Sequence, residues 1–150
     1  MTEAYLGVIL DYVLKVGSLL SYVNIFSRFF TKKPRFSITD VSMTLTPREK
    51  REPRLDVGFK LWNGKSKLDK FRSSDALNVN VFVIPITVEN EIIEASTSRE
   101  PAGIIPVGRF HPSKHIMNIP KPVATVYIRV KCPETVLTKN LKLTEYLNKQ

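Results

Sequence analysis

The sequence predicts a mainly β protein, an antiparallel β-sandwich of about seven strands behind one long N-terminal α-helix. Three observations favour this fold class. Apolar and polar residues alternate with a period of two in several stretches after residue 36, most of the ten prolines fall between these stretches, and no helical period separates them. The last observation argues against a parallel βαβ arrangement. We therefore divide the chain into a hydrophobic helix over residues 1–31 and a β-sandwich domain over residues 32–150.

The N-terminal stretch predicts a helix that is suited to an apolar medium. No proline occurs between Ala4 and Phe30, and eighteen of these twenty-seven residues are apolar. At about 1.5 Å per residue the helix would be roughly 40 Å long, enough to cross a hydrocarbon core of about 30 Å. Its apolar face carries the predicted membrane-anchor residues, which are Val8, Tyr12, Val16, Leu19, Leu20, Val23, Phe26 and Phe30.

Three modes stay open for this helix: it spans a membrane, lies flat in the interface, or packs on its own domain. Asp11 and Lys15 are one turn apart and can neutralise each other, which permits spanning. The longest uncharged run, over residues 16–27, has twelve residues, short of the usual eighteen or so, which argues against spanning. An interfacial helix would explain both the apolar face and the charges. Membrane association is favoured over packing on protein.

The positive charge of the chain is concentrated in one zone. There are 23 basic and 14 acidic residues, a formal net charge of +9, and +7 of it falls within residues 32–72. A basic zone beside a membrane helix attracts anionic headgroups. The expected contacts are Lys32, Lys33, Arg35, Lys50, Arg51 and Arg54. Lys65, Lys67, Lys70 and Arg72 could join the loop over residues 47–54 in one positive rim.

The flanking charges also orient a spanning helix. Lys32, Lys33 and Arg35 follow its C-terminal end, whereas Glu3 alone is charged before it. The positive-inside rule then holds the β domain on the cytoplasmic side of the membrane.

The remaining chain is interpreted as strands in the order in which they occur. Alternation is clearest over residues 55–62, 77–84 and 124–131, and weaker candidates cover residues 36–45, 86–95, 104–110 and 136–143. A bulge near Thr39 is expected, because the apolar residues change phase there. Pro85 is expected to end a central strand. The predicted buried residues are Phe59, Leu61, Val79, Val81, Val126 and Ile128. Residues 143–147 could form one helical turn.

Two segments resemble prokaryotic immunoglobulin-like domains that are carried behind a single N-terminal membrane helix. One is the strand and Asn-Gly ending over residues 54–66, and the other is the Lys33-Pro-Arg-Phe36 stretch. The resemblance covers about thirty residues and lacks the two cysteines around a core tryptophan. It implies a small Ig-like sandwich with an anchored layout and no functional residues. A jelly-roll-like sandwich stays open as the other arrangement.

Catalytic and ligand-binding motifs are missing from the sequence. Gly64-Lys65-Ser66 ends like a P-loop, but Phe59 stands where the first glycine is needed. His111 and His115 have helical ligand spacing, yet Pro112 lies between them, so we expect a loop pair without function. Cys132 is expected to be a buried structural thiol. The sequence therefore predicts no enzyme, no cofactor and no metal.

The resulting functional hypothesis is a non-enzymatic, membrane-associated β-sandwich that binds a protein partner or assembles with itself. Trp62 is the possible partner contact, because it lies on the strand face opposite Leu61. One alternative is a structural subunit of a virion, an envelope or another surface assembly. A second alternative is a basic nucleic-acid-binding module, which is disfavoured because few aromatic residues accompany the charges. No small-molecule substrate is evident.

Overall fold

The computed structural model describes residue 11 and residues 32–147. The chain divides into two units, Met1–Lys32 and Lys33–Gln150, and only the second is considered below. The helix predicted over residues 1–31 and its eight anchor residues lie outside the described residues, with Asp11 the single exception. Within the described part of the chain, every helix is short, and none is long and apolar enough to cross a membrane.

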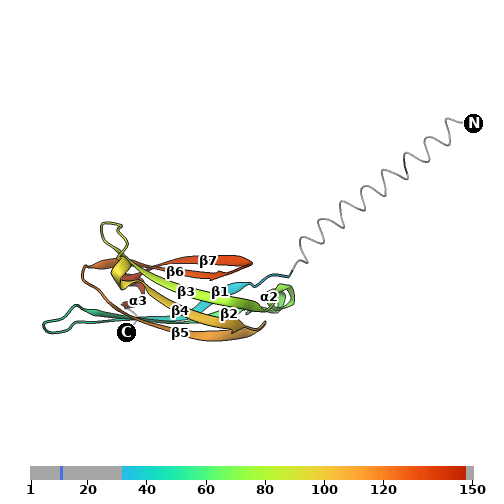
Figure 1. The fold of residues 1–150 in the computed structure, drawn as a ribbon, viewed down its shortest axis with the longest axis horizontal. Coiled ribbons are helices and arrows are strands. Elements are labelled where there is room, and N and C mark those ends of the chain that lie inside the picture. Colours follow the sequence, from blue (N-terminus) through green and yellow to red (C-terminus); the bar gives the residue numbers. More distant parts are fainter. Residues whose placement is uncertain (1–10, 12–31, 148–150) are drawn as a thin grey trace, which may run out of the picture. The chain divides into compact units, whose positions relative to one another are not determined.

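Seven antiparallel strands form two sheets, which confirms the predicted mainly β, sandwich-like fold (Figure 1). The three-stranded sheet has the order β1-β2-β5, built from Phe36–Thr46, Arg54–Asn63 and Arg109–Asn118. The four-stranded sheet has the order β4-β3-β6-β7, built from Ser98–Ile105, Ala76–Thr87, Val123–Cys132 and Thr135–Lys142. The short helices are α2 (Lys67–Arg72), the 3-10 turn η1 (Glu94–Ser96) and α3 (Leu143–Leu147), the last at the predicted helical turn.

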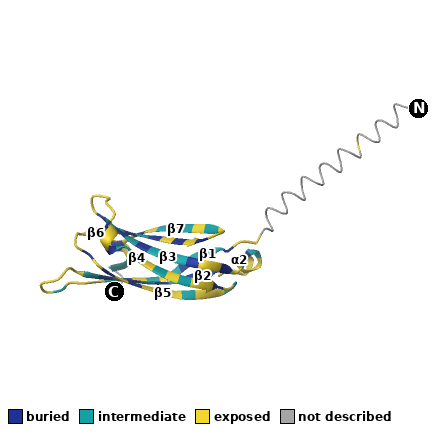
Figure 2. Ribbon diagram, viewed as in Figure 1, coloured by how far each residue is buried: buried dark blue, intermediate teal, exposed yellow. Residues whose placement is uncertain are grey.

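The core lies between the two sheets and consists of the residues that alternate inward. All six predicted core residues are buried, each at 4% exposure or less. In β2 every second residue from Leu55 to Asn63 is buried, and the residues between them are half-exposed (Figure 2). The predicted bulge is also confirmed, because the β1–β2 register shifts between Thr39 and Ser42 and Asp40 has φ of 53°. The two-residue period therefore decides which face each side chain occupies.

Pro85 does not end the central strand, contrary to the prediction. β3 continues to Thr87, and the separate strand expected over residues 86–95 is replaced by the end of β3, a turn and η1. The ladder between β3 and β4 ends at Val83, and the backbone oxygen of Pro85 accepts from Ile93 N at 3.1 Å. The backbone nitrogen of Pro85 thus lies on the side of β3 where β4 no longer pairs with it. No strand there needs an N–H donor from residue 85.

The strand predicted over residues 104–110 is wrong as well, because two strands meet there. β4 and β5 are separated by a turn over residues 106–108. β5 then continues through Pro112, which an edge strand tolerates because one side of its backbone has no partner strand. His111 and His115 therefore lie on a strand and not in the loop that was predicted for them.

Asn63, the last residue of β2, ties the two sheets together. Its side chain is fully buried. Its Nδ2 group donates to the backbone oxygens of Ser74 and Ile105 at 2.8 and 2.9 Å, just before β3 and at the end of β4. Its Oδ1 accepts from the backbone N–H of Arg35 at 3.1 Å, just before β1. One amide side chain therefore joins the beginning of the three-stranded sheet to two strands of the other sheet.

The chain crosses from one sheet to the other directly after Asn63. Gly64 has φ of +73°, and a Cβ there would lie 2.9 Å from Ser73 Oγ and 3.0 Å from Lys70 Cα. Glycine is required because any side chain would meet both the backbone strain and these atoms. The Asn-Gly pair thus ends the strand, as expected, and α2 fills the crossing to β3.

Replacing Asn63 should destabilise the sandwich strongly. Asn63→Ala leaves three backbone groups without their partner, and each buried unsatisfied group costs roughly 1–3 kcal/mol, so we expect a loss of about 3 kcal/mol or more. Asn63→Asp keeps the acceptor for Arg35 but turns a carboxylate oxygen toward two carbonyls, and should be no better. Urea unfolding measures both.

The matched control is Asn140→Ala on the exposed face of β7, which should change the unfolding free energy by less than about 0.5 kcal/mol. A loss of under about 1 kcal/mol for Asn63→Ala would contradict the role given to this side chain, since even one unsatisfied buried group costs that much.

Candidate functional site

Trp62 lies on the outer face of the three-stranded sheet, as its alternation with Leu61 predicted. Its ring packs against that of Phe110 in β5, with the two centroids 4.8 Å apart. The indole Nε1 donates to Thr39 Oγ1 in β1 at 3.0 Å, and Lys60 Nζ lies 4.9 Å from the Phe110 centroid. Phe110 remains 42% exposed. We call Trp62, Phe110 and Lys60 the aromatic patch, a cluster built from the adjacent strands β2 and β5.

A shallow trough follows the aromatic patch along the same sheet face. It forms over Gly58, which has no side chain to fill the space between β1 and β5. A Cβ at this position would lie 3.1 Å from Ser42 Oγ, so even alanine would crowd the floor. The lining carries both charges, with Asp56 and Lys114 among its residues. The patch and the trough together give an apolar contact beside a polar hollow.

The predicted anionic-surface residues do not form one cluster. Lys33 and Arg35 lie at the end of the sandwich that carries α2, whereas Lys50 and Arg51 lie in the β1–β2 turn at the opposite end (Figure 1). The two ends are about 30 Å apart, because the ten residues of β2 extend from one to the other. Lys32 belongs to the first unit of the chain. The loop over residues 47–54 therefore cannot share one rim with the lysines of α2.

Arg54, one of the predicted anionic-surface residues, has a partner within its own strand. Its guanidinium forms two hydrogen bonds with the Asp56 carboxylate, at 2.8 and 3.0 Å. The hydrogen bond from Arg54 holds the pKa of Asp56 below its ordinary value, against a smaller opposing effect of burial. Lys50 and Arg51 are exposed in the β1–β2 turn, and Arg48 beside them donates to Asn118 Oδ1 at 3.0 Å.

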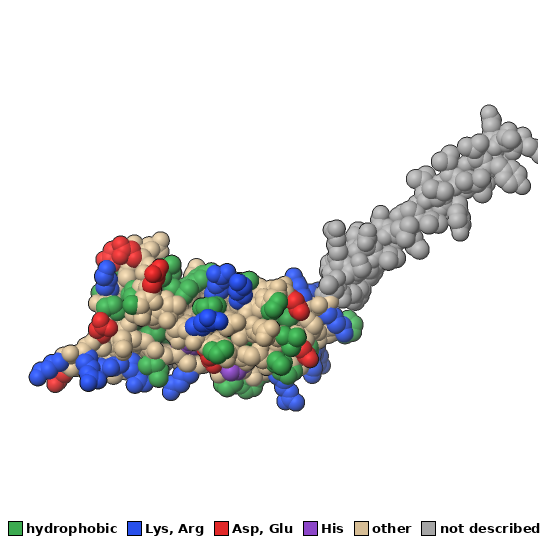
Figure 3. Space-filling view, in the orientation of Figure 1, with side chains coloured by type: hydrophobic (Ala, Val, Ile, Leu, Met, Phe, Trp, Pro, Cys, Tyr) green, Lys and Arg blue, Asp and Glu red, His purple; other side chains and the backbone are tan. Residues whose placement is uncertain are grey.

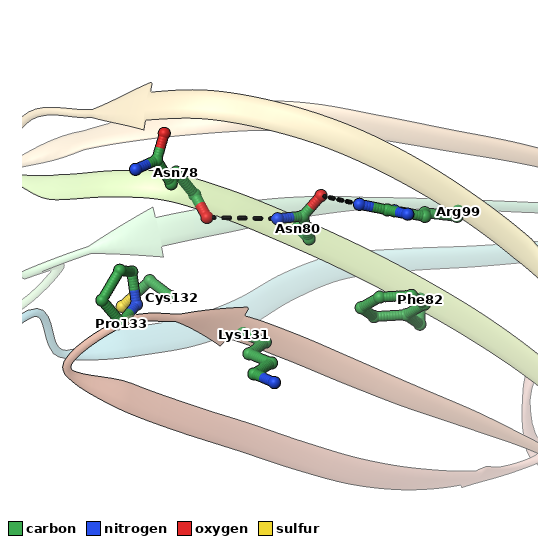
Figure 4. Close-up of a pocket in the computed structure, with 7 residues that line it drawn as sticks. All are labelled: Asn78, Asn80, Phe82, Arg99, Lys131, Cys132 and Pro133. Atoms are coloured by element: carbon green, nitrogen blue, oxygen red, sulfur yellow. Dashed lines mark hydrogen bonds between the residues drawn. The ribbon is translucent and has the colours of Figure 1, made fainter.

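Basic side chains also cover part of the four-stranded sheet (Figure 3). There a shallow hollow of about 350 Å³ lies between β3, β4 and β6 (Figure 4). Asn80 accepts from Arg99 Nη2 at 3.2 Å, and the Arg99 guanidinium lies 5.6 Å from the Phe82 ring centroid. Lys131 lines the other side. Cys132 is buried, as expected, and its exposure of 4% leaves little of the thiol to any ligand in this hollow.

A polar cluster that sequence reasoning missed lies where the edge strands β4 and β5 face each other. His115 is 1% exposed; its Nδ1 lies 2.8 Å from Ser98 Oγ and its Nε2 lies 2.8 Å from Ser113 Oγ. Glu100 Oε2 lies 3.1 Å from His115 Nε2 and accepts from Ser113 at 2.5 Å. The other Glu100 oxygen lies 2.6 Å from His111 Nε2.

The environment of this cluster favours a carboxylate beside a neutral imidazole. Burial lowers the pKa of His115 below its ordinary value and outweighs the neighbouring Glu100 carboxylate, which acts in the opposite direction. Burial also acts to raise the pKa of Glu100, but hydrogen bonds from Ser113 and His111 and the charge of both histidines outweigh it, so this pKa is lowered. At neutral pH Glu100 is therefore ionised and His115 is uncharged.

The cluster has the residue types of an acyl-transfer triad but not its hydrogen-bond directions. A serine nucleophile must give its proton to the imidazole, whereas Ser113 donates to Glu100. Ser113 is also only 4% exposed, so a substrate does not reach its oxygen. The Phe59 ring stacks on His115 with the centroids 5.9 Å apart. The arrangement is suited to joining the two sheets across their open edge.

One signal in the sequence pointed to this cluster. His111, Ser113 and His115 are two residues apart, which places all three side chains on one face of a strand. The prediction of a loop pair for the two histidines did not use this spacing. Ser98 and Glu100 have the same spacing on β4, but nothing in the sequence indicates that β4 and β5 face each other.

The buried imidazole should make stability depend on pH. The folded pKa of His115 lies below its ordinary 6.5, so below about pH 6.5 the unfolded chain binds a proton that the folded chain rejects. Stability should fall as the pH drops from 7.5 to 5.5, with a slope of at most about 1.4 kcal/mol per pH unit for one proton. Glu100 adds a loss only below about pH 4.5, because its folded pKa is lowered from that value.

Urea unfolding at several pH values measures this slope. His115→Gln should flatten it between pH 7.5 and 5.5, while His111→Gln, which leaves the buried ring in place, should keep most of it. Equal slopes for wild type and His115→Gln would contradict the assignment.

Among the described residues, no group of three or more His, Cys, Asp or Glu side chains is placed to hold a metal ion. Comparison with known proteins adds no relative from which a site could be transferred. No protein-family model matches this chain, and no curated protein matches it significantly.

Proposed function

We propose that this chain is a non-enzymatic, membrane-associated β-sandwich that binds a protein partner, or a second copy of itself, through the outer face of its three-stranded sheet. The observation that carries the proposal is the exposed aromatic patch. The Trp62 and Phe110 rings pack against each other at a tilt of 45°, with Lys60 beside them. Tryptophan is among the residues that carry most binding energy at protein interfaces, and aromatic residues are enriched in interface cores.

The geometry of the patch supports a binding role because its side chains are held in place. The indole N–H is bonded to Thr39, and the ring is braced by Phe110. A side chain that is already ordered loses little conformational entropy when a partner covers it. The trough over Gly58 offers a neighbouring hollow in which a partner side chain with polar groups can lie.

We also propose that the sandwich is Ig-like and not jelly-roll-like. Seven strands divided into three and four support this, because a jelly roll has eight strands. The order differs from the constant-type immunoglobulin domain in one respect. Here the fourth strand pairs with the third, in the sheet that also holds β6 and β7, where the constant-type domain pairs it with the fifth.

The membrane part of the proposal rests on the sequence before Lys33. Eighteen apolar residues between Ala4 and Phe30 are more than a surface segment needs, and basic residues follow them directly. Anionic lipid is the expected partner of these charges, and the cytoplasmic side is the expected location of the sandwich.

Nucleic-acid binding is a second candidate, favoured by the outer face of the four-stranded sheet. Arg99 and Lys131 flank Phe82 there, which joins basic and aromatic groups in one hollow (Figure 4). Stacking of bases needs several exposed rings, however, and Phe82 is half-buried under Arg99. The protein-binding proposal therefore has the stronger support.

A photoreactive phenylalanine analogue at position 110 should crosslink to the partner in intact cells. The matched control carries the analogue at Phe82 on the outer face of the other sheet, where no crosslink is expected. Trp62→Ala should weaken binding by about 2 kcal/mol or more, as loss of a central interface aromatic does. A crosslinked dimer would indicate self-assembly, and many copies in a regular array would indicate the structural-subunit alternative. Crosslinks from position 82 alone would contradict the proposed face.

Removing residues 1–32 should abolish membrane association without unfolding the sandwich, because Lys33–Gln150 is a compact unit. The measurement is co-flotation with zwitterionic phosphatidylcholine vesicles, with circular dichroism to check the fold. Full-length chain that stays at the bottom of the gradient would remove the membrane part of the proposal. Loss of structure in the shortened chain would favour a helix packed on the domain.

A further inference from the structure

The helix α2 presents its apolar side chains to solvent. None of its six residues is buried, and Leu68 and Phe71 are 57% and 62% exposed. Three residues apart, they lie on the same side of the helix. Both ends of α2 are capped: Ser66 Oγ accepts from Asp69 N at 3.0 Å, and Ser73 Oγ donates to Asp69 O. A fixed turn thus directs two large apolar groups away from the core.

Basic residues surround these two apolar side chains. Lys65, Lys67 and Lys70 are exposed on and before the helix, and Lys33 is exposed at the same end. Three acidic residues lie nearby and are outnumbered by these four lysines. Asp69 is half-buried, whereas Asp75 and Glu134 are exposed; Asp75 accepts from Val107 N at 3.0 Å, and Glu134 accepts from Ser74 Oγ at 3.5 Å. The α2 end, defined by Lys33, Lys65 and residues 67–72, therefore offers positive charge around an apolar centre.

The apolar N-terminal sequence joins the sandwich at this same end. Gly64 N donates to Arg35 O at 2.9 Å, which fixes the residues before β1 beside the start of the crossing to α2. Lys33 and Asp69 line one shallow hollow. The chain therefore enters the sandwich, at Lys33, on the end that carries α2.

We propose that the α2 end docks on the surface of an anionic bilayer, with Leu68 and Phe71 among the headgroups and the lysines against lipid phosphates. This inference rests on the membrane association proposed above and names a second contact for it. The charge complementarity commits the surface to lipid, because apolar groups ringed by lysine are the composition of interfacial segments. A protein partner would need a far larger area than a six-residue helix supplies.

The test uses the full-length chain with a nitroxide label at Leu68→Cys, in a Cys132→Ala background. The control label is at Val88→Cys, since Val88 is 67% exposed in the loop after β3, away from α2. Vesicles contain phosphatidylcholine with or without phosphatidylserine. Collision rates with oxygen and with a water-soluble nickel complex report whether each label lies in lipid or water, and flotation reports membrane association separately.

With phosphatidylserine present, the label at position 68 should move into lipid and the label at position 88 should stay in water. Lys65→Gln with Lys67→Gln should reduce docking roughly 25-fold, because each lysine near an anionic surface contributes about fivefold. Lys50→Gln with Arg51→Gln removes the same charge at the opposite end and should leave the label at position 68 in lipid.

The outcomes separate this inference from the proposed function. A chain that floats while position 68 remains in water overturns docking and keeps membrane association. If the chain does not float on phosphatidylcholine vesicles but the label at position 68 enters lipid with phosphatidylserine, docking of the α2 end is supported and the membrane role of residues 1–32 is contradicted. A label that is immobilised without lipid overturns docking in favour of a protein or a second copy on the α2 end.

Discussion

The arrangement of this sandwich depends on how the chain leaves β2. Asn63 satisfies backbone groups from before β1, before β3 and at the end of β4, so a single side chain fixes where the two sheets meet. Asn63 is buried because it continues the inward series of β2, and its amide replaces the water that these backbone groups would otherwise need. The residue before it, Trp62, is turned outward by the same alternation. The candidate interface and the join between the sheets are therefore consecutive positions of one strand.

The two ends of the sandwich differ in composition, and long strands keep them apart. β1 and β2 carry Lys50 and Arg51 to a narrow turn of two strands, where the neighbouring residues Glu49 and Glu52 are acidic (Figure 3). The α2 end combines lysines with exposed apolar groups and lies beside the join to the N-terminal sequence. The basic residues thus fall in separate regions, at the two ends and on the four-stranded sheet. The end that also exposes apolar side chains is the better suited to a lipid surface.

The open edge between β4 and β5 is held by polar groups, where much of the remaining interior is apolar. His115 and Glu100 meet there with two serine hydroxyls, and each hydrogen-bonding group of the imidazole has a partner. Such a network specifies one alignment of the edge strands, since a shift by one residue would remove His115 from the interior. This network makes the fold sensitive to acid. As the pH falls, the unfolded chain binds a proton at His115 that the folded chain does not, and the free energy of unfolding decreases.

The sequence by itself determined the faces of β2, β3 and β6, the bulge in β1 and the outward position of Trp62. These follow from local alternation, because a strand with one buried face must place every second residue inside. It also placed the end of β2 at the Asn-Gly pair. Only the tertiary structure decided that Pro85 lies within a strand, that His115 meets Glu100, and that Lys33 and Lys50 lie at opposite ends. Each of these depends on which strand lies alongside, and pairing between residues distant in the sequence leaves no periodic trace within either segment.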